Sequence, residues 1–248
     1  MLQVPDAVIL AGGAGLRLKS VTGDVPKPMA KIGNRPFLEL LLLQLKRQGF
    51  NRVVLSVGQK QQTIREHFGE RAFGLQLSYS FEPIPLGTGG GLRQSAAQVA
   101  TDNFLALNGD SYTDVDLYQL VQTHLDRKPD VTLAVTPGTR SDGGSVGFDQ
   151  GSKVTTFSEK RAVQGASYLS AGIYMLKKPL VVEIEPGLNI SLEEQLFPEW
   201  LAGGKHIQAF ASPAKCVDIG TPERYQQAQA LLASVELNEN MLRSENKV

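Results

Sequence analysis

The stretch Leu10-Ala11-Gly12-Gly13-Ala14-Gly15-Leu16-Arg17-Leu18 is the part of this sequence from which the fold can be worked out. Residues 8–10 form a short apolar run that stops at two glycines, as a buried parallel strand does when it enters a tight turn. Gly12, Gly13 and Gly15 carry no Cβ atom, so a ligand can approach the backbone closely. Free N–H groups in such a turn bind phosphate oxygens, and the stretch therefore predicts a phosphate-binding turn.

Two cationic side chains follow this turn. Arg17 carries a guanidinium fork suited to bidentate contact with phosphate. Lys27 stands between Pro26 and Pro28, each of which fixes its own φ, so the ammonium group lies on a stiffened loop. We predict that Arg17 and Lys27 hold a polyphosphate. The alternative is a turn whose glycines serve backbone geometry alone.

Two other phosphate-binding motifs do not fit the sequence. The string G-x-x-x-x-G-K-[ST] does not occur. The dinucleotide fingerprint G-x-G-x-x-G begins at Gly13 and Gly15, but Leu18 stands in place of its third glycine.

The composition narrows the class of protein. The chain has 248 residues with 25 basic and 25 acidic side chains, and a net charge of zero argues against a nucleic-acid-binding surface. No stretch reaches 18 apolar residues, so no membrane-spanning helix is predicted. The start of the chain, with Asp6 before the glycines, does not resemble a signal peptide. Cys216 is the single cysteine, which excludes an internal disulfide, and we expect a cytoplasmic protein.

The first 135 residues alternate between strand and helix patterns, which indicates an α/β fold with a mostly parallel sheet and helices on both faces. The expected strands are 6–10, 52–57, 75–81, 104–107 and 131–135. The expected helices are 37–48, 59–68, 87–99 and a helix capped by Asp116 that runs to 126. The connection 11–36 is long, which is typical of functional loops.

The pattern changes after residue 135. Short strands at 145–148, 153–158 and 168–176 indicate an added antiparallel section, followed by a helix at 191–201, a strand at 207–210 and a helix at 222–237. We expect one domain over residues 1–237. Its core spans about 1–135 and 205–237, the inserted section spans about 136–204, and residues 238–248 form a polar tail.

Two aspartates are candidate metal ligands. Ligands of parallel sheets bind beyond the carboxyl ends of the strands, where Asp110 follows an expected strand in Asn108-Gly109-Asp110. Asp218 follows an apolar pair and precedes Ile219-Gly220-Thr221-Pro222. Two carboxylates that meet at the sheet edge suit Mg²⁺ bound to a triphosphate. The alternatives are a turn residue for Asp110 and a helix preamble for Asp218.

Glu82 and the glycine-rich turn at 87–91 are candidates for contact with the base. A helix N-terminus there offers donors, and its glycines leave room for a flat ring. Guanine presents two adjacent donors, N1–H and the 2-amino group, which one carboxylate accepts, whereas uracil or thymine presents a single N–H. Glu82 therefore favours GTP, and the alternative is a glutamate of a surface turn.

A second substrate is expected at the inserted section. Lys160 is a candidate for holding its phosphate and Glu159 for accepting sugar hydroxyls, although an adjacent Glu-Lys pair is also typical of solvated surface. Ser170-Ala171-Gly172 interrupts an apolar strand, which either leaves room for a sugar or marks a β-bulge. The three histidines show no metal-binding spacing, and we expect structural or surface roles for them: His67, His124 and His206.

Together these motifs resemble those of the sugar-1-phosphate nucleotidylyltransferases, in the same order and over nearly the whole chain. The residues that carry the resemblance are Leu10 to Leu18 with its glycines, Pro26-Lys27-Pro28, Leu86-Gly87-Thr88-Gly89-Gly90, Asn108-Gly109-Asp110, Glu159-Lys160, Ala171-Gly172-Ile173-Tyr174 and Asp218-Ile219-Gly220-Thr221-Pro222. Within that family, residues 19–21, 24–30 and 35–39 are most similar to those of D-glycero-D-manno-heptose 1-phosphate guanylyltransferases.

The resemblance implies a Rossmann-like three-layer nucleotidyltransferase fold with an inserted sugar-binding section. It implies catalytic roles for Arg17, Lys27 and Asp110, and Mg²⁺ held by Asp110 and Asp218. It implies sugar-phosphate contacts from Glu159, Lys160, Ser170 and Gly172. The nucleotide-binding residues that it implies are Leu10, Ala11, Gly12, Gly13, Gly15, Glu82, Gly87, Thr88 and Gly109.

Three positions depart from the family pattern. Leu16 replaces a common threonine, Ser170 a common asparagine and Arg161 a common proline. Leu16 removes one possible hydrogen bond to phosphate, and Ser170 replaces the residue that usually contacts the sugar. Arg161 lacks the fixed φ of a proline, so the local path of the chain can differ.

We expect the protein to condense GTP with a sugar 1-phosphate, which gives a GDP-sugar and pyrophosphate. The sugar 1-phosphate that we expect first is D-glycero-alpha-D-manno-heptose 1-phosphate. The GDP-sugar would serve the synthesis of capsule, lipopolysaccharide or S-layer polysaccharide. The alternatives are a mannose-1-phosphate guanylyltransferase, a uridylyltransferase on another sugar phosphate, or a non-catalytic nucleotide-binding subunit. We expect small-molecule substrates, no nucleic-acid or membrane partner, and a homo-oligomer as one option.

Overall fold

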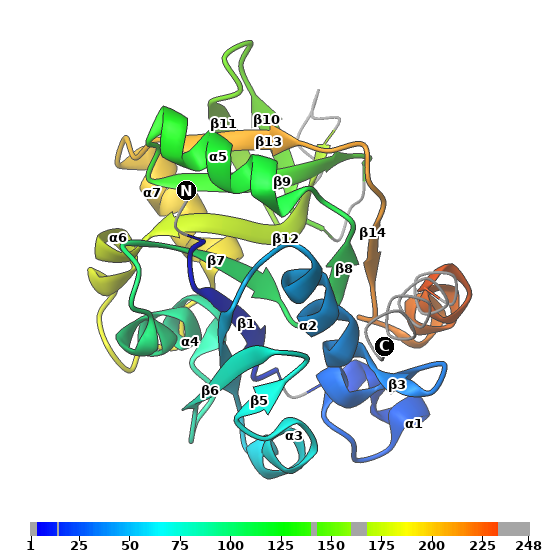
Figure 1. Ribbon diagram of the computed structural model, residues 1–248. Coiled ribbons are helices and arrows are strands. Elements are labelled where there is room, and N and C mark those ends of the chain that lie inside the picture. The colour runs from blue at the N-terminus through cyan, green and yellow to red at the C-terminus, as the bar shows by residue number, and fades with distance from the viewer. Residues whose placement is uncertain (1–3, 14, 140–142, 160–167, 233–248) are drawn as a thin grey trace, which may run out of the picture.

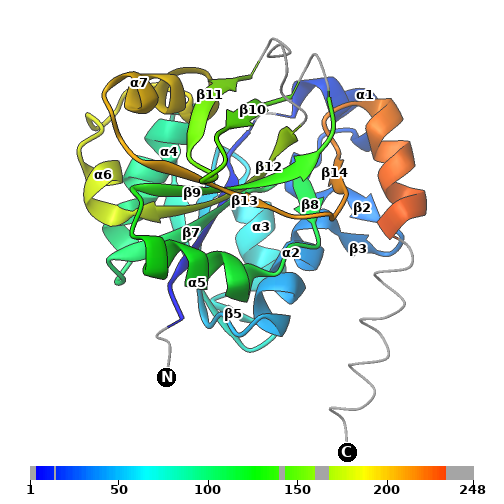
Figure 2. The same ribbon diagram turned by 90° about the horizontal axis from the view of Figure 1, so that it is seen from above.

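The computed structural model describes residues 4–13, 15–139, 143–159 and 168–232. A twisted central sheet separates two layers of helices (Figures 1 and 2). The α/β fold predicted from the sequence is therefore confirmed.

Apart from β5, which the sequence did not indicate, the strands of the sheet agree closely with the expected ones. They are β1 (Ala7–Ala11), β4 (Arg52–Val57), β5 (Arg71–Ala72), β6 (Leu75–Phe81), β7 (Asn103–Asn108), β9 (Val131–Pro137), β10 (Ser145–Phe148), β11 (Val154–Ser158), β12 (Tyr168–Lys177) and β13 (Ile207–Ala211). The main helices are α2 (Phe37–Arg47), α3 (Gln61–Phe68), α4 (Gly87–Ser95), α5 (Leu117–Arg127), α6 (Lys178–Val182), α7 (Phe197–Ala202) and a helix over 222–232.

The order of the strands places the carboxyl ends of the first strands together. The path is β11-β10-β12-β7-β1-β4-β6-β5, with β9 paired to β12 and β13. β1, β4, β6 and β7 are parallel, so the residues that follow them emerge at one edge of the sheet. The β12 strand, which the sequence groups with the added antiparallel section, lies between β7 and β9 and is antiparallel to both. Its residues 171–176 are buried on both faces, which requires an interior position.

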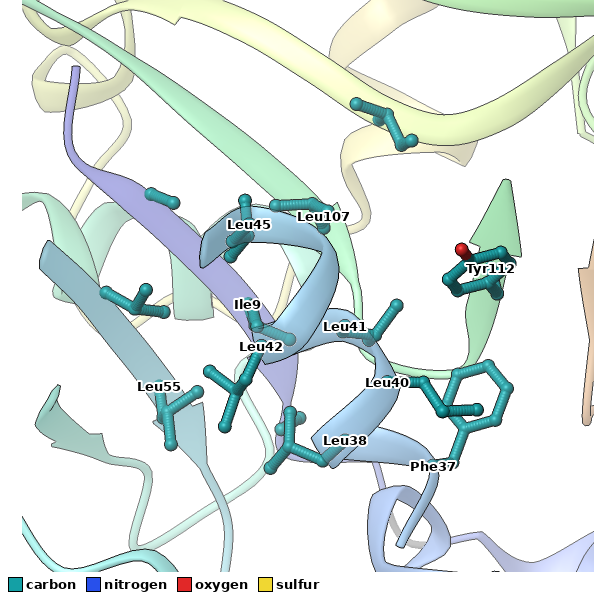
Figure 3. Packing of buried hydrophobic residues seen from close by; sticks show 14 of the residues in the cluster. Ile9, Phe37, Leu38, Leu40, Leu41, Leu42, Leu45, Leu55, Leu107 and Tyr112 are labelled. Carbon is teal, nitrogen blue, oxygen red and sulfur yellow. The ribbon is translucent and has the colours of Figure 1, made fainter. Parts of the chain in front are cut away.

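Alternation along the strands divides the core into two parts. Ile9, Leu55 and Leu107 point to the face that α2 covers, and Figure 3 shows the leucines of α2 packed over them. Val8, Val54 and Ala106 point to the opposite face, which α4, α6 and α7 cover. The apolar face predicted for α2 is buried in full: Leu38, Leu41, Leu42 and Leu45.

The connection expected as one long loop contains short elements. These are η1 (Leu16–Leu18), α1 (Lys19–Thr22), η2 (Lys27–Met29), β2 (Lys31–Ile32) and β3 (Arg35–Pro36). The helix over 222–232 holds this segment, because Tyr225 and Gln229 both donate to the carbonyl of Lys31 at 2.5 Å. None of the helices in the described part of the chain is both long and apolar enough to cross a membrane.

His124 is a buried side chain of α5 with a structural role. Its Nε2 lies 3.0 Å from Oδ1 of Asn103 and its Nδ1 lies 2.9 Å from Oγ1 of Thr132. Because an amide oxygen only accepts, Nε2 carries the proton and Nδ1 accepts from the threonine hydroxyl. Burial, reinforced by the charge of Lys177, lowers the pKa of His124 from 6.5 to about 4.

This pKa makes stability depend on pH. The unfolded chain binds a proton at His124 near pH 6.5, whereas the folded chain does so only near pH 4, so this contribution to stability is complete above pH 6.5 and is lost as the pH falls. We expect His124 to contribute a loss on the order of 3 kcal/mol in the free energy of unfolding between pH 7 and pH 4. Urea denaturation across this range should show that His124→Gln removes the loss, whereas the exposed His67→Gln keeps it. Equal pH slopes in all three proteins would contradict the assignment.

Candidate functional site

The glycine turn after β1 lies directly against the loop that carries Lys27. Gly15 has φ of +61°, and a Cβ atom there would lie 3.0 Å from Cβ of Lys27. Lys27 opens η2, where the N–H of Met29 donates to the carbonyl of Pro26 at 2.8 Å. Pro28 and Met29 are buried, so the base of Lys27 is anchored beside the turn, as its two flanking prolines predict.

Lys27 meets Asp110 at the carboxyl edge of the sheet. Its Nζ donates to Oδ2 of Asp110 at 2.5 Å, and the lysine side chain is only 11% exposed against 38% for the aspartate. Asp110 follows β7, and the N–H of Gly109 donates to the carbonyl of Leu10 at 3.0 Å. The ends of β1 and β7 therefore meet next to Asp110, where a Cβ atom on Gly109 would lie 2.6 Å from the carbonyl oxygen of Leu10 and 3.2 Å from Cα of Ala11.

A small antiparallel ladder brings Asp218 to the same place. β14 (Cys216–Asp218) pairs with β8 (Ser111–Thr113) so that Asp218 stands opposite Ser111, and Figure 1 shows the two strands side by side. The N–H of Ile219 donates to the carbonyl of Asp110 at 3.0 Å. A Cβ atom on Gly220 would lie 2.9 Å from Oδ1 of Asp218 and 3.9 Å from Nζ of Lys27. The two aspartates that the sequence leaves unconnected are thus neighbours.

The donor set at this edge suits Mg²⁺ bound to a nucleotide. Among the described residues, no group of three or more histidine, cysteine, aspartate and glutamate side chains forms a closed metal cage. Magnesium usually takes one or two carboxylates and completes its shell with water and substrate phosphates. Asp110 and Asp218 supply two carboxylates, which Lys27 and Arg224 neutralise; the Arg224 contact is 3.4 Å.

Arg17 is exposed on η1 and makes no ion pair with any residue that the structure describes. It lies two residues after Gly15, on the segment whose N–H at Leu18 donates to the carbonyl of Gly15 at 3.0 Å. Its guanidinium group is therefore available to a ligand at the glycine turn.

Glu82 lies beneath the glycine turn rather than on a surface turn. It is 7% exposed, and a Cβ atom on Gly12 would lie 2.8 Å from its Oε1. Its Oε1 accepts from the Ser56 hydroxyl at 2.7 Å and its Oε2 from the N–H of Leu86 at 3.2 Å. An ionised carboxylate has about four acceptor positions, and within the described part of the chain these two donors occupy two of them.

The turn with Gly87 and Thr88 packs against a distant segment. A Cβ atom on Gly87, where φ is +70°, would lie 2.5 Å from the carbonyl oxygen of Ile190. The Thr88 hydroxyl donates to Glu193 at 2.6 Å and accepts from the N–H of Leu192 at 2.8 Å. These contacts hold the N-terminus of α4 in place and occupy the threonine side chain.

The residues expected at the sugar gather on β12 and around it. The register between β12 and β9 shifts between Ser170 and Tyr174, with Gly172 at φ of +69°, which is the irregularity expected from the alternative of a β-bulge. A Cβ atom on Gly144 would lie 3.0 Å from both Oε2 of Glu159 and Cβ of Ser170, so these side chains are neighbours. Lys160 and Arg161 lie outside the described residues.

Two further side chains lie between the candidate nucleotide and sugar residues and are not among the predicted site residues, although the first of them belongs to the Asn108-Gly109-Asp110 motif. Asn108 lies against Gly172: a Cβ atom on Gly172 would be 3.1 Å from Nδ2 of Asn108. Asn108 also directly precedes Gly109 and Asp110 in the chain. Glu193 is 7% exposed and accepts from the Tyr174 hydroxyl at 3.2 Å. Burial, and secondly the charge of Glu193, raise the pKa of Tyr174 well above 10. The sequence signal for Glu193 is that it is a charged residue next to Leu192 on the apolar face of an expected helix.

A separate cavity of about 670 Å³ lies on the far side of the β8–β14 ladder, lined by residues that include Tyr112, Val217 and Leu231. None of the predicted site residues lines it.

Comparison with known proteins supports a common origin for this arrangement. Residues 6–235 match the family model described as nucleotidyl transferase. The chain is 36% identical over 224 residues to the D-glycero-alpha-D-manno-heptose 1-phosphate guanylyltransferase of Aneurinibacillus thermoaerophilus, which covers 90% of this chain and 96% of that protein. It is 35% identical to the mannose-1-phosphate guanylyltransferase of Mycobacterium tuberculosis, over 91% of this chain and 64% of that one.

Solved structures of similar sequence have the same fold as this chain. The crystal structure of HddC from Yersinia pseudotuberculosis has a TM-score of 0.81 at 31% identity and covers 92% of this chain and 100% of its own. The same protein complexed with GMP-PN has a TM-score of 0.77.

Close backbone contact at Gly109 yields a prediction. A Cβ atom there would lie 2.6 Å from the carbonyl oxygen of Leu10, a backbone atom that cannot give way cheaply, whereas one on Gly13 meets nothing within 4 Å. We expect Gly109→Ala to lower the free energy of unfolding by about 1–3 kcal/mol, which is the usual cost of overpacking, and Gly13→Ala to leave it unchanged. Urea denaturation measures both, and equal stability of the two variants would contradict the packing.

Proposed function

We propose that this chain, which belongs to the nucleotidyl transferase family, condenses GTP with a sugar 1-phosphate to a GDP-sugar and pyrophosphate. The observation that carries the proposal is the convergence of Lys27, Asp110 and Asp218 beside the glycine turn. The sugar that the relatives favour is D-glycero-alpha-D-manno-heptose, because the chain covers 96% of such a guanylyltransferase at 36% identity. Mannose 1-phosphate is the second candidate, since a mannose-1-phosphate guanylyltransferase is 35% identical.

The reaction is an in-line displacement at phosphorus. An oxygen of the sugar 1-phosphate attacks the α-phosphorus of GTP, a new P–O bond forms, and the bond to the β-phosphate breaks with its electron pair leaving on pyrophosphate. The attacking phosphate monoester has a second pKa of about 6, so it is already a dianion near neutral pH and needs no protein base. Catalysis therefore consists of orientation and charge neutralisation.

The side chains divide this task. Arg17 holds the β- and γ-phosphates with its guanidinium fork. Lys27 neutralises the charge that develops between the α-phosphate and the leaving group, and its buried base keeps the ammonium group in place. Asp110 and Asp218 are the residues that would hold Mg²⁺. When bound, the ion supplies positive charge to the phosphate oxygens.

Glu82 reads the base in this proposal. Two of its acceptor positions are taken by Ser56 and Leu86, and the remaining two match the N1–H and 2-amino donors of guanine. Glu159 and Ser170, with Gly172, contact the sugar beyond Asn108. Lys160 holds the sugar phosphate.

Pyrophosphate release tests the proposal directly. The protein is incubated with Mg²⁺, each of four nucleoside triphosphates, and the 1-phosphates of D-glycero-alpha-D-manno-heptose, mannose and glucose. We expect release with GTP and the heptose phosphate, and its abolition by a chelator. Preference for UTP would indicate a uridylyltransferase, and no release with any pair would indicate a non-catalytic nucleotide-binding subunit.

The role of Lys27 predicts a kinetic signature. We expect Lys27→Ala to lower kcat by about 10²–10³-fold with a much smaller change in the KM for GTP, because its charge is needed most in the transition state. Lys31→Ala removes an exposed lysine of the same loop and serves as the control. An unchanged kcat in Lys27→Ala would remove this lysine from the reaction.

The role of Glu82 predicts a change in selectivity. Glu82→Gln keeps the shape of the side chain but offers one acceptor oxygen and a donor, so the ratio of kcat/KM for GTP to that for UTP should fall by about tenfold or more. The exposed Glu66→Gln is the matched control. If Glu82→Gln keeps the selectivity of the unmodified enzyme, the base is read elsewhere.

A further inference from the structure

Glu193 is a buried carboxylate whose acceptor positions are all used within the protein. Its Oε1 accepts from Nδ2 of Asn108 at 3.3 Å and from the Tyr174 hydroxyl at 3.2 Å. Its Oε2 accepts from the Thr88 hydroxyl at 2.6 Å and from the Ser191 hydroxyl at 3.4 Å. Because a carboxylate has about four lone-pair positions, Glu193 has none left for a substrate.

Three of these four donors come from three different elements around the site, whereas Ser191 lies two residues before Glu193 itself. Thr88 lies on α4 at the turn on the nucleotide side, Tyr174 lies on β12 two residues after Gly172, and Asn108 ends β7 two residues before Asp110. These three donors lie at least 20 residues apart in the sequence, and Glu193 joins them in a single contact set.

The backbone around Glu193 reinforces this connection. The carbonyl of Ile190 accepts from the N–H of Gly89 at 2.9 Å, and the N–H of Ile190 donates to the carbonyl of Leu86 at 2.9 Å. Residues 192–196 form a single π-helical turn, η4 (Leu192–Leu196), and such turns are frequent at functional sites.

We infer that Glu193 is a positioning residue that couples the nucleotide side of the site to its sugar side, by holding Thr88, Asn108 and Tyr174 in one arrangement. The inference deepens the proposed function and rests on it for the identity of the two substrates. The coupled elements are the turn at 86–90 and the bulged strand β12.

The orientation of Asn108 shows why the negative charge matters. A carboxylate only accepts, so the NH₂ group of Asn108 faces Glu193 and its Oδ1 faces away. This oxygen is buried without a hydrogen-bond partner among the described residues. An unsatisfied buried acceptor is costly, so the amide keeps this orientation only while Glu193 requires it. A glutamine at 193 offers an NH₂ group of its own and permits the amide beside Asp110 to turn over.

Steady-state kinetics with GTP and heptose 1-phosphate tests the coupling. We expect Glu193→Gln to raise the KM for both substrates by about fivefold or more, because the nucleotide side and the sugar side of the site lose a hydrogen-bond acceptor that they share. The exposed neighbour Glu194→Gln, on the same helical turn, should keep both values within about twofold. A change confined to one substrate would overturn the inference.

A double-mutant cycle separates coupling from simple loss of contacts. Thr88→Val and Tyr174→Phe each remove one donor, and they bond to opposite oxygens of Glu193. With Glu193 present, their combined effect on kcat/KM should differ from the product of the single effects by about threefold or more. In the Glu193→Gln background, the combined effect of Thr88→Val and Tyr174→Phe on kcat/KM should equal the product of their single effects. Multiplication in both backgrounds would overturn the inference.

Hydrogen exchange provides a readout that does not need activity. Thr88→Val, which leaves the carboxylate in place, should raise amide exchange in the peptide 168–176 as well as in 86–92, and Glu193→Gln should do the same. Glu194→Gln should change neither peptide. Unchanged exchange in 168–176 would overturn the coupling even if the enzyme accepts the proposed substrates. Conversely, if no substrate pair releases pyrophosphate, the proposed function fails while this measurement still decides the coupling.

Discussion

The antiparallel pairing of β8 with β14 is the interaction on which the candidate site depends. It sets Asp218 opposite Ser111 and ties the N–H of Ile219 to the carbonyl of Asp110. Two carboxylates that are more than 100 residues apart in the chain thereby share one edge with Lys27. Without this ladder, Asp218 would not lie beside Asp110 and Lys27.

Close backbone contact is the second constraint. The parallel strands β1 and β7 end side by side, and glycines at their ends let the turn and the following loop approach without side chains between them. The loop that carries Lys27 is fixed by the burial of Pro28 and by a hydrogen bond from the helix over 222–232 to the carbonyl of Lys31. A site for an anion needs such support, because exposed cations on loose loops lose entropy when they bind.

The sugar side is built on a different principle. The β12 strand enters the central sheet against the direction of its neighbours and carries a bulge where it passes Asn108. The Nδ2 group of Asn108 and the hydroxyl of Tyr174 meet there, and both donate to one buried carboxylate, Glu193. Through the same side chain, the bulged strand β12 is connected to the turn that carries Thr88.

The sequence by itself determined the features that depend on local signals: the glycine turn after β1, the stiffened lysine between two prolines, and the bounds of strands such as β4 and β6. It also predicted the bulge at Ser170 to Gly172 as one of two options. Only the tertiary structure decided that β12 lies between β7 and β9, that Asp218 stands beside Asp110, and that Glu193 faces inward. The reason is physical. Periodicity and turn chemistry act over a few residues, whereas strand order and the pairing of distant charges depend on how the whole chain buries its apolar surface.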